Sequence, residues 1–172
     1  MANEAGALVR VAGMFSQRGF NIETLNVAPT EDPAISRLTL VTEGTEQIVT
    51  QINRQLLKLV DVIEVHDLTG GAHLERELAL LKVRASSGPR AEQADPVTAI
   101  AAQHGADMVS LDEGMHTLQF VGTAKDLDAL IRALVEAGGL EEEVRSGALA
   151  MTLGAQRLHF VQSYDDADAL TF

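Results

Sequence analysis

The sequence predicts an α+β protein built from two similar units, each an antiparallel sheet with two helices on one face. Three observations predict this class. The chain has 172 residues and is 46% hydrophobic, enough to bury a core in one medium domain or two small ones. Segments with helical and strand periodicity alternate along it. After a glycine-containing connector at residues 69–73, the order of segments in the first half returns in the second.

The first half opens with a predicted helix. Residues 3–6, Asn-Glu-Ala-Gly, are typical of a helix start, because Asn3 or a neighbour can cap free backbone amides and Glu4 suits the positive end of the helix dipole. Gly19 is expected to end the helix in a left-handed conformation. The apolar residues at helical spacing are Leu8, Val11, Ala12 and Phe15.

Alternating apolar residues predict three strands in the rest of the first half, at 21–28, 35–43 and 60–68. Residues 29–33 (PTEDP) form a turn between the first two strands. Thr45 is expected to cap a second helix, whose apolar face holds Ile48, Ile52, Leu56 and Leu59.

The second half repeats this order and adds a strand at its beginning. The predicted strands are 78–85, 107–111, 115–121 and 140–152. One helix runs from its cap at Asp95-Pro96 to Gly105, and residues 86–89 form a loop before it. Another helix starts at Thr123 and ends at Gly138-Gly139, with an apolar face of Leu127, Leu130, Ile131, Leu134 and Val135. The acidic run at 141–143 is interpreted as a solvated strand entry.

The order strand–helix–strand–strand–helix–strand is that of a ferredoxin-like (βαββαβ) unit, and the first half has it without the opening strand. We therefore expect a first domain at 1–69, a linker at 70–77, a second ferredoxin-like domain at 78–155 and a tail at 156–172. Such sheets leave one face uncovered, which favours pairing of copies.

Composition disfavours several classes of function. The net charge of −12 disfavours nucleic acid as a partner, and no apolar run is long enough to cross a membrane. Cysteine is absent, which excludes thiolate chemistry, and the five histidines show no metal-ligand spacing, so we expect neither a catalytic nor a metal site. The chain begins without a signal segment, so we expect a cytoplasmic protein.

The most informative segment is 3–22. An asparagine and a glycine at a helix start expose several backbone amides without side-chain cover, a geometry that holds a small carboxylate well. On spacing alone, ordinary helix capping explains the same residues.

A family resemblance extends this interpretation. The runs NEAGALVRVAGMFSQRGFNIETLNVAPTEDPAISRLTLVTEG (3–44), QINRQLLKLVDVIEVHDL (51–68), GAHLERELALLKV (71–83) and VRSG (144–147) resemble the regulatory small subunit of acetolactate synthase, also called acetohydroxyacid synthase. The motifs FSQRGFNIETL, VAPTEDP and QLLKLVDV are specific to that family among proteins of this fold. By the same resemblance the first unit is similar to an ACT domain, an amino-acid-sensing module, and the second unit is ACT-like.

The resemblance implies a regulatory subunit without an active site of its own. It implies that the chain binds a large catalytic subunit of acetolactate synthase, raises its activity and confers feedback inhibition by valine or another end product of branched-chain amino acid biosynthesis. The large subunit of the family holds thiamine diphosphate, Mg²⁺ and FAD, so no cofactor is expected in this chain.

The resemblance also implies an effector site where the ACT domains of a homodimer meet. One wall consists of Asn3 through its side chain and Gly6, Ala7 and Leu8 chiefly through their backbone. The other wall consists of Asn21 and Ile22 of the partner subunit. Helix-start amides suit the α-carboxylate, asparagine oxygens suit the ammonium group and Ile22 suits an aliphatic side chain.

Two departures from the family pattern are visible. The family has a strand before the NEAGAL turn, whereas only Met1 and Ala2 precede Asn3 here, and residues 156–172 extend past the VRSG motif. Rival interpretations are a stand-alone ACT-type amino-acid sensor or regulator, a small metalloenzyme whose fold gathers the histidines, and an oligomerisation module without a ligand.

Overall fold

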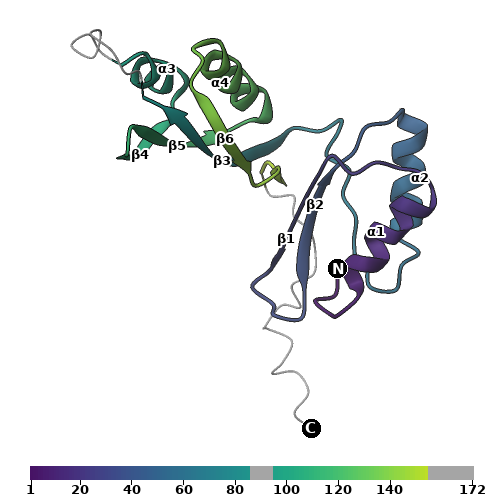
Figure 1. Cartoon of the computed structure of the whole chain (residues 1–172). Helices are drawn as coiled ribbons and strands as arrows, with labels where there is room; N and C mark the ends of the chain where they lie inside the picture. The colour runs from purple at the N-terminus through teal and green to yellow at the C-terminus, as the bar shows by residue number, and fades with distance from the viewer. Residues whose placement is uncertain (86–94, 155–172) are drawn as a thin grey trace. The chain divides into compact units, whose positions relative to one another are not determined.

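The computed structural model describes residues 1–85 and 95–154 (Figure 1). Their mixed helices and antiparallel sheets confirm the predicted fold class. The described residues divide into two compact units, Glu75–Leu149 and a unit that combines Met1–Leu74 with residues 150–154. The predicted loop at 86–89 and the predicted tail at 156–172 lie outside the described residues.

In the first unit, two helices pack against a two-stranded antiparallel sheet. The helices are α1 (Ala7–Gln17) and α2 (Glu46–Leu56), and the strands are β1 (Thr24–Pro29) and β2 (Ser36–Val41). The buried apolar residues at the centre of its core are Val11, Met14, Phe15, Ile52 and Leu56. The predicted α2 face is confirmed, because Ile48 and Leu59 also pack against this cluster.

The strand predicted at 60–68 is wrong, because residues 62–68 take part in no strand pairing. In a ferredoxin-like sheet the fourth strand lies at an edge and pairs only with the first strand. In this chain the place of the first strand is taken by Met1 and Ala2, and Ala2 forms one isolated bridge with Ile35. Ala2 also donates its amide to the carbonyl of Asp61 at 2.7 Å. Residues 62–68 therefore have the alternating apolar pattern of a strand but no neighbouring strand with which to form hydrogen bonds.

The second unit is a complete βαββαβ unit. Its elements are β3 (His73–Arg84), α3 (Pro96–His104), β4 (Asp107–Asp112), β5 (Met115–Gly122), α4 (Ala124–Glu136) and β6 (Leu140–Arg145). The strands follow the order β4-β5-β3-β6 with antiparallel neighbours, and α3 and α4 lie together on one face (Figure 1). The largest side chains of its core are Leu81, Leu118, Phe120, Leu127, Leu130 and Leu134.

Two strands of the second half differ from their predicted bounds. β3 begins at His73, so residues 73–77 of the predicted linker belong to a strand. The predicted strand 140–152 is interrupted after Arg145, and its end forms β7 (Leu149–Thr152), which pairs with β3. The interruption has a local cause, because Gly147 adopts a φ of 75° that is incompatible with an extended strand.

The helix caps are the most accurate sequence predictions. The side chains of Thr45, Asp95 and Thr123 each accept a hydrogen bond from a first-turn amide, as expected. The helix faces are less accurate, because Val135 is exposed rather than part of the core. In α1 the fully covered residues are Ala7, Val11, Met14 and Phe15, whereas Leu8 faces solvent.

Candidate functional site

The start of α1 has the open backbone geometry that the sequence predicts, and of the predicted asparagine and glycine it is Gly6 that creates it. Gly6 is the N-cap residue, with a φ of 88°, and no side chain caps the helix. A left-handed φ of this kind favours glycine, because other residues carry a Cβ that clashes there. The first-turn amides of Leu8 and Val9 have no carbonyl partner within the helix. This corner therefore presents N–H donors at the positive end of the helix dipole, where a carboxylate binds well.

Asn3 does not cap α1, contrary to the expectation from its position. Its backbone amide donates to the carbonyl of Ala34 at 2.7 Å, and its side-chain Nδ2 donates to the carbonyl of Pro33 at 2.8 Å. Both bonds fix the turn before α1 to the loop before β2. The side-chain oxygen of Asn3 is left as an acceptor on the exposed side of this turn.

Ala7 and Leu8 face opposite environments. The side chain of Ala7 is buried in the first unit, so only its backbone can contact a ligand, as the resemblance implies. Leu8 is 38% exposed although it belongs to the predicted apolar face of the helix. An exposed leucine beside free helix-start amides places an aliphatic surface next to N–H donors of the kind that suit a carboxylate.

Asn21 and Ile22 lie in the connection between α1 and β1. The side-chain amide of Asn21 donates to the carboxylate of Glu23, and the backbone carbonyl of Asn21 accepts from the hydroxyl of Thr42 at 2.6 Å. Ile22 is half-buried against the core of the first unit. In the described parts of one chain, no hydrogen bond or ion pair joins these two residues to the turn at 3–8.

An ion pair beside the helix start was not anticipated. Arg10 on α1 donates through Nε and Nη2 to the two carboxylate oxygens of Asp61, with Nη2 to Oδ1 at 2.6 Å. Asp61 is only 6% exposed, whereas the arginine is half-exposed. The hydrogen bonds from Arg10 lower the pKa of the Asp61 carboxyl, so the pair is charged at neutral pH. The two residues are distant in sequence, and no local pattern signals that they meet.

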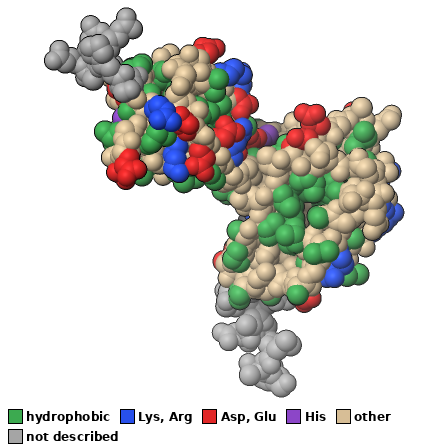
Figure 2. Space-filling view, viewed as in Figure 1, with side chains coloured by type: hydrophobic (Ala, Val, Ile, Leu, Met, Phe, Trp, Pro, Cys, Tyr) green, Lys and Arg blue, Asp and Glu red, His purple; other side chains and the backbone are tan. Residues whose placement is uncertain are grey.

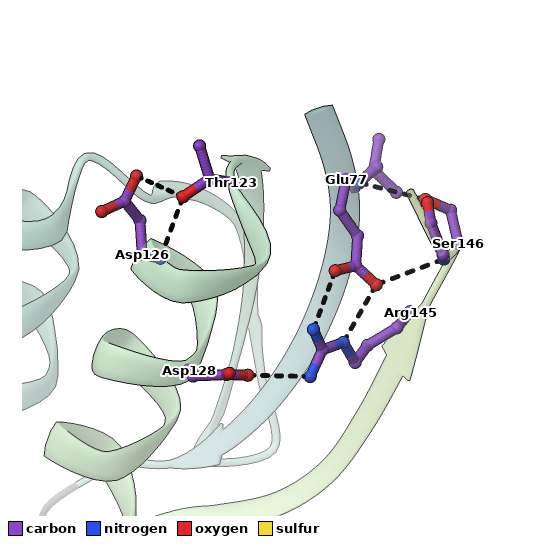
Figure 3. Close-up of polar contacts among 8 residues, drawn as sticks. Glu77, Thr123, Asp126, Asp128, Arg145 and Ser146 are labelled. Atoms are coloured by element: carbon purple, nitrogen blue, oxygen red, sulfur yellow. Dashed lines mark hydrogen bonds and ion pairs between the residues drawn. The ribbon is translucent and has the colours of Figure 1, made fainter. Parts of the chain in front are cut away.

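The densest polar cluster of the second unit is structural (Figure 3). Glu77 on β3 is 2% exposed, and both of its carboxylate oxygens accept from Arg145 at the end of β6. Arg145 also donates to Asp128 on α4 at 3.0 Å, and the pKa of its guanidinium is raised chiefly by the hydrogen bonds to Glu77. The amide of Gly147 donates to Glu77 as well. These contacts hold the chain at the point where β6 ends.

The described ranges 1–85 and 95–154 contain neither a candidate metal site nor a candidate membrane-spanning helix. No group of three or more histidine, aspartate or glutamate side chains there could hold a metal ion. No helix in those ranges is long and apolar enough to cross a membrane.

Comparison with known families identifies both units. Residues 1–64 match the family model described as the AHAS small subunit-like ACT domain, and residues 76–154 match the model described as the small subunit of acetolactate synthase. The chain belongs to the acetolactate synthase small-subunit family. The two matches confirm the resemblance that the sequence motifs indicate.

Individual members of the acetolactate synthase small-subunit family resemble the chain over most of its length. It is 43% identical to the isozyme 3 small subunit of Salmonella typhimurium over 154 residues, which are 90% of this chain and 92% of that protein. It is 44% identical to the small subunit of Haemophilus influenzae, with 92% and 94% covered. The crystal structure of the small subunit from Thermotoga maritima superimposes with a TM-score of 0.75 at 30% identity, covering 87% of this chain and 91% of that one.

Proposed function

We propose that this chain binds the catalytic large subunit of acetolactate synthase, raises its activity and makes it sensitive to inhibition by valine or a related branched-chain amino acid. A regulatory role in that enzyme is supported by relatives that are themselves small subunits of acetolactate synthase. Sensitivity to an amino acid is supported chiefly by the helix start at Gly6, which has no side-chain cap and lies in a domain that matches an ACT family model.

The effector site that we propose has two walls from two copies of the chain. The first wall is the turn of Asn3, Gly6, Ala7 and Leu8, where amides receive the α-carboxylate. The second wall is Asn21 and Ile22 of the partner subunit, where the asparagine carbonyl oxygens accept from the ammonium group. The aliphatic side chain of the effector then lies against Leu8 and Ile22.

The sheet of the first unit has an edge suitable for such a dimer. β1 pairs with β2 on one side, and among the described residues no other strand pairs with its opposite edge. Val27 on β1 and Val41 on β2 are 37% and 38% exposed, and Figure 2 shows hydrophobic side chains gathered over this part of the first unit. Asn21 and Ile22 immediately precede this strand, so pairing through β1 would bring them to the dimer seam.

Regulation follows if the effector favours one dimer geometry over another. A ligand shifts such a balance only by its differential affinity for the two states, and a coupling free energy of about 1–3 kcal/mol is typical. A small aliphatic pocket discriminates one methylene by about 1–3 kcal/mol, so valine, leucine and isoleucine are all candidate effectors. In this proposal the thiamine diphosphate, Mg²⁺ and FAD belong to the catalytic partner.

The test is reconstitution with an acetolactate synthase large subunit. The two proteins are purified together, and acetolactate formation is measured with and without this chain and over a series of valine, leucine and isoleucine concentrations. We expect co-purification, a higher rate with the chain present and inhibition by at least one of the three. A chain that binds an amino acid but not the large subunit would instead be a stand-alone sensor.

A further inference from the structure

We propose that Arg10, held in place by the buried Asp61, binds the carboxylate of the effector together with the helix-start amides. This inference rests on the proposed function, since it adds a charged residue to the effector site described above. It makes Arg10 a specificity-determining residue, selective for small molecules that carry a free carboxylate.

The geometry places one guanidinium nitrogen at the Gly6 corner. Asp61 engages Nε and Nη2 of Arg10, and this bidentate contact leaves Nη1 as the outward nitrogen of the fork. Nη1 lies 3.0 Å from the position that a Cβ on Gly6 would occupy. The absence of a side chain at Gly6 therefore does two things: it permits the left-handed φ and it lets a cationic donor lie against Gly6, the residue that begins the helix.

The free donors at this corner suit an added anion, while Asp61 balances the charge of Arg10 itself. A cation near the start of a helix is unfavourable, because the helix dipole already makes that end positive. α1 has no acidic residue in its first turn and no side-chain cap, unlike α2 and α4, which have both. Besides Asp61, the nearby Glu4 is the residue whose negative charge acts on Arg10. On a chain of net charge −12, this corner combines a guanidinium with free amides.

The role of Asp61 is to position Arg10 rather than to contact the ligand. Its side chain is buried and both of its oxygens are engaged by the guanidinium. Because the planar fork is fixed by two bonds, the direction of Nη1 is also fixed. A lysine at position 10 would keep the charge but could not maintain this bidentate arrangement.

The test compares ligands as well as proteins. Valine, leucine, isoleucine and their carboxamides are titrated by calorimetry into the full chain and into Arg10→Met, Arg10→Lys and Arg18→Met. Arg18→Met is the matched control, because it removes the same charge from the other end of α1, where Arg18 contacts Met14 and Gln55. Arg10→Met alone leaves the buried carboxylate of Asp61 without its partner. The double variant Arg10→Met/Asp61→Asn replaces that carboxylate by a neutral amide and so separates loss of binding from loss of folding.

We expect Arg10→Met and the double variant to weaken binding of the free amino acid about tenfold or more, while carboxamide binding changes little. Arg10→Lys should lie between these variants and the original chain, and Arg18→Met should bind normally. An equal loss for amino acid and carboxamide would mean that Arg10 acts only through folding and would overturn this inference alone. If the original chain binds none of the three amino acids, the proposed effector site falls and this inference falls with it.

Discussion

Gly6 is the residue on which the proposed site most depends. We predict that Gly6→Asp produces feedback resistance, with effector affinity lowered at least about tenfold. The new carboxylate would lie next to Nη1 of Arg10, 3.0 Å from the Cβ position, and would repel the carboxylate of the effector. Calorimetry with valine, and inhibition curves of the reconstituted enzyme, measure the effect; unchanged affinity would place the effector elsewhere.

The control for this variant is Gly6→Ala, which introduces the backbone strain and a Cβ beside Nη1 of Arg10 but no charge. Alanine at a φ of 88° is expected to lower the free energy of unfolding by about 1–2 kcal/mol. Chemical denaturation of both variants separates the two contributions. If Gly6→Ala abolished binding as completely as Gly6→Asp does, strain rather than charge would explain the resistance.

The ion pair of Asp61 with Arg10 should make the stability of the folded chain depend on pH in the acid range. Because Arg10 lowers the pKa of this carboxyl in the folded chain, its contribution to stability is fully present above the unfolded value of 3.8 and is lost as pH falls through the lower folded value. As the pH falls below 3.8, the Asp61→Asn variant should therefore lose less stability than the original chain does. Thermal unfolding midpoints across this range measure the difference, and parallel curves would contradict the assignment.

At the scale of elements, the contacts of Arg145 hold the end of β6 in place. Replacing it by methionine leaves the carboxylate of Glu77 buried without its partner, so we predict that Arg145→Met lowers the free energy of unfolding by about 3 kcal/mol. Asp128→Asn is the matched control, because Asp128 is half-exposed and its pair with Arg145 is expected to contribute less than about 1 kcal/mol. Equal effects in urea denaturation would contradict this division.

The segment that replaces the fourth strand of the first unit should differ dynamically from true strands. Residues 62–68 take part in no strand pairing, whereas residues 79–83 of β3 lie between two neighbouring strands. We predict that backbone amides of 62–68 exchange with solvent much faster than those of 79–83. Hydrogen exchange followed by mass spectrometry tests this, and equal protection would mean that the segment is paired.

Sequence patterns predicted local features of the fold, such as helix caps, better than they predicted which segments pair as strands. Thr45, Asp95 and Thr123 cap their helices because a cap depends on residues within one turn. The strand at 60–68 was wrong because a strand also depends on a partner distant in sequence. Leu8 and Val135 fit apolar stripes by spacing yet are exposed, because spacing alone does not show how wide the covered face is.

At the scale of the whole molecule, the family could be predicted from motifs and is confirmed, whereas the location of the effector site stays a prediction and the Arg10–Asp61 pair could not be predicted. The turn from Asn3 to Leu8 is continuous in sequence, and its helix-start chemistry was recognisable. No sequence pattern distinguished Arg10 from the other residues of the helix. Its role depends on Asp61, which the fold brings to it from a segment that periodicity had assigned to a strand.

Coupling between subunits gives a further prediction. Asn21 lies before the open edge of β1, on the proposed partner wall of the site, and its replacement by histidine changes that wall without changing Gly6 or Arg10. We predict that Asn21→His weakens inhibition of the reconstituted enzyme more than it weakens activation. Rates with and without the chain and the effector give both quantities, and an equal loss of both would indicate a surface that binds the large subunit.

The central claim, that each effector site is completed by two copies, is tested most directly by a mixed dimer. Gly6→Asp chains and Asn21→His chains carrying different affinity tags are co-expressed, the mixed dimer is isolated, and effector binding is measured by calorimetry. One site of this dimer would combine both defects, and the other would contain an intact Gly6 turn and an intact Asn21. We expect one normal-affinity site per mixed dimer and none in either parental dimer, and a mixed dimer with no normal-affinity site would show that the two walls do not come from different copies.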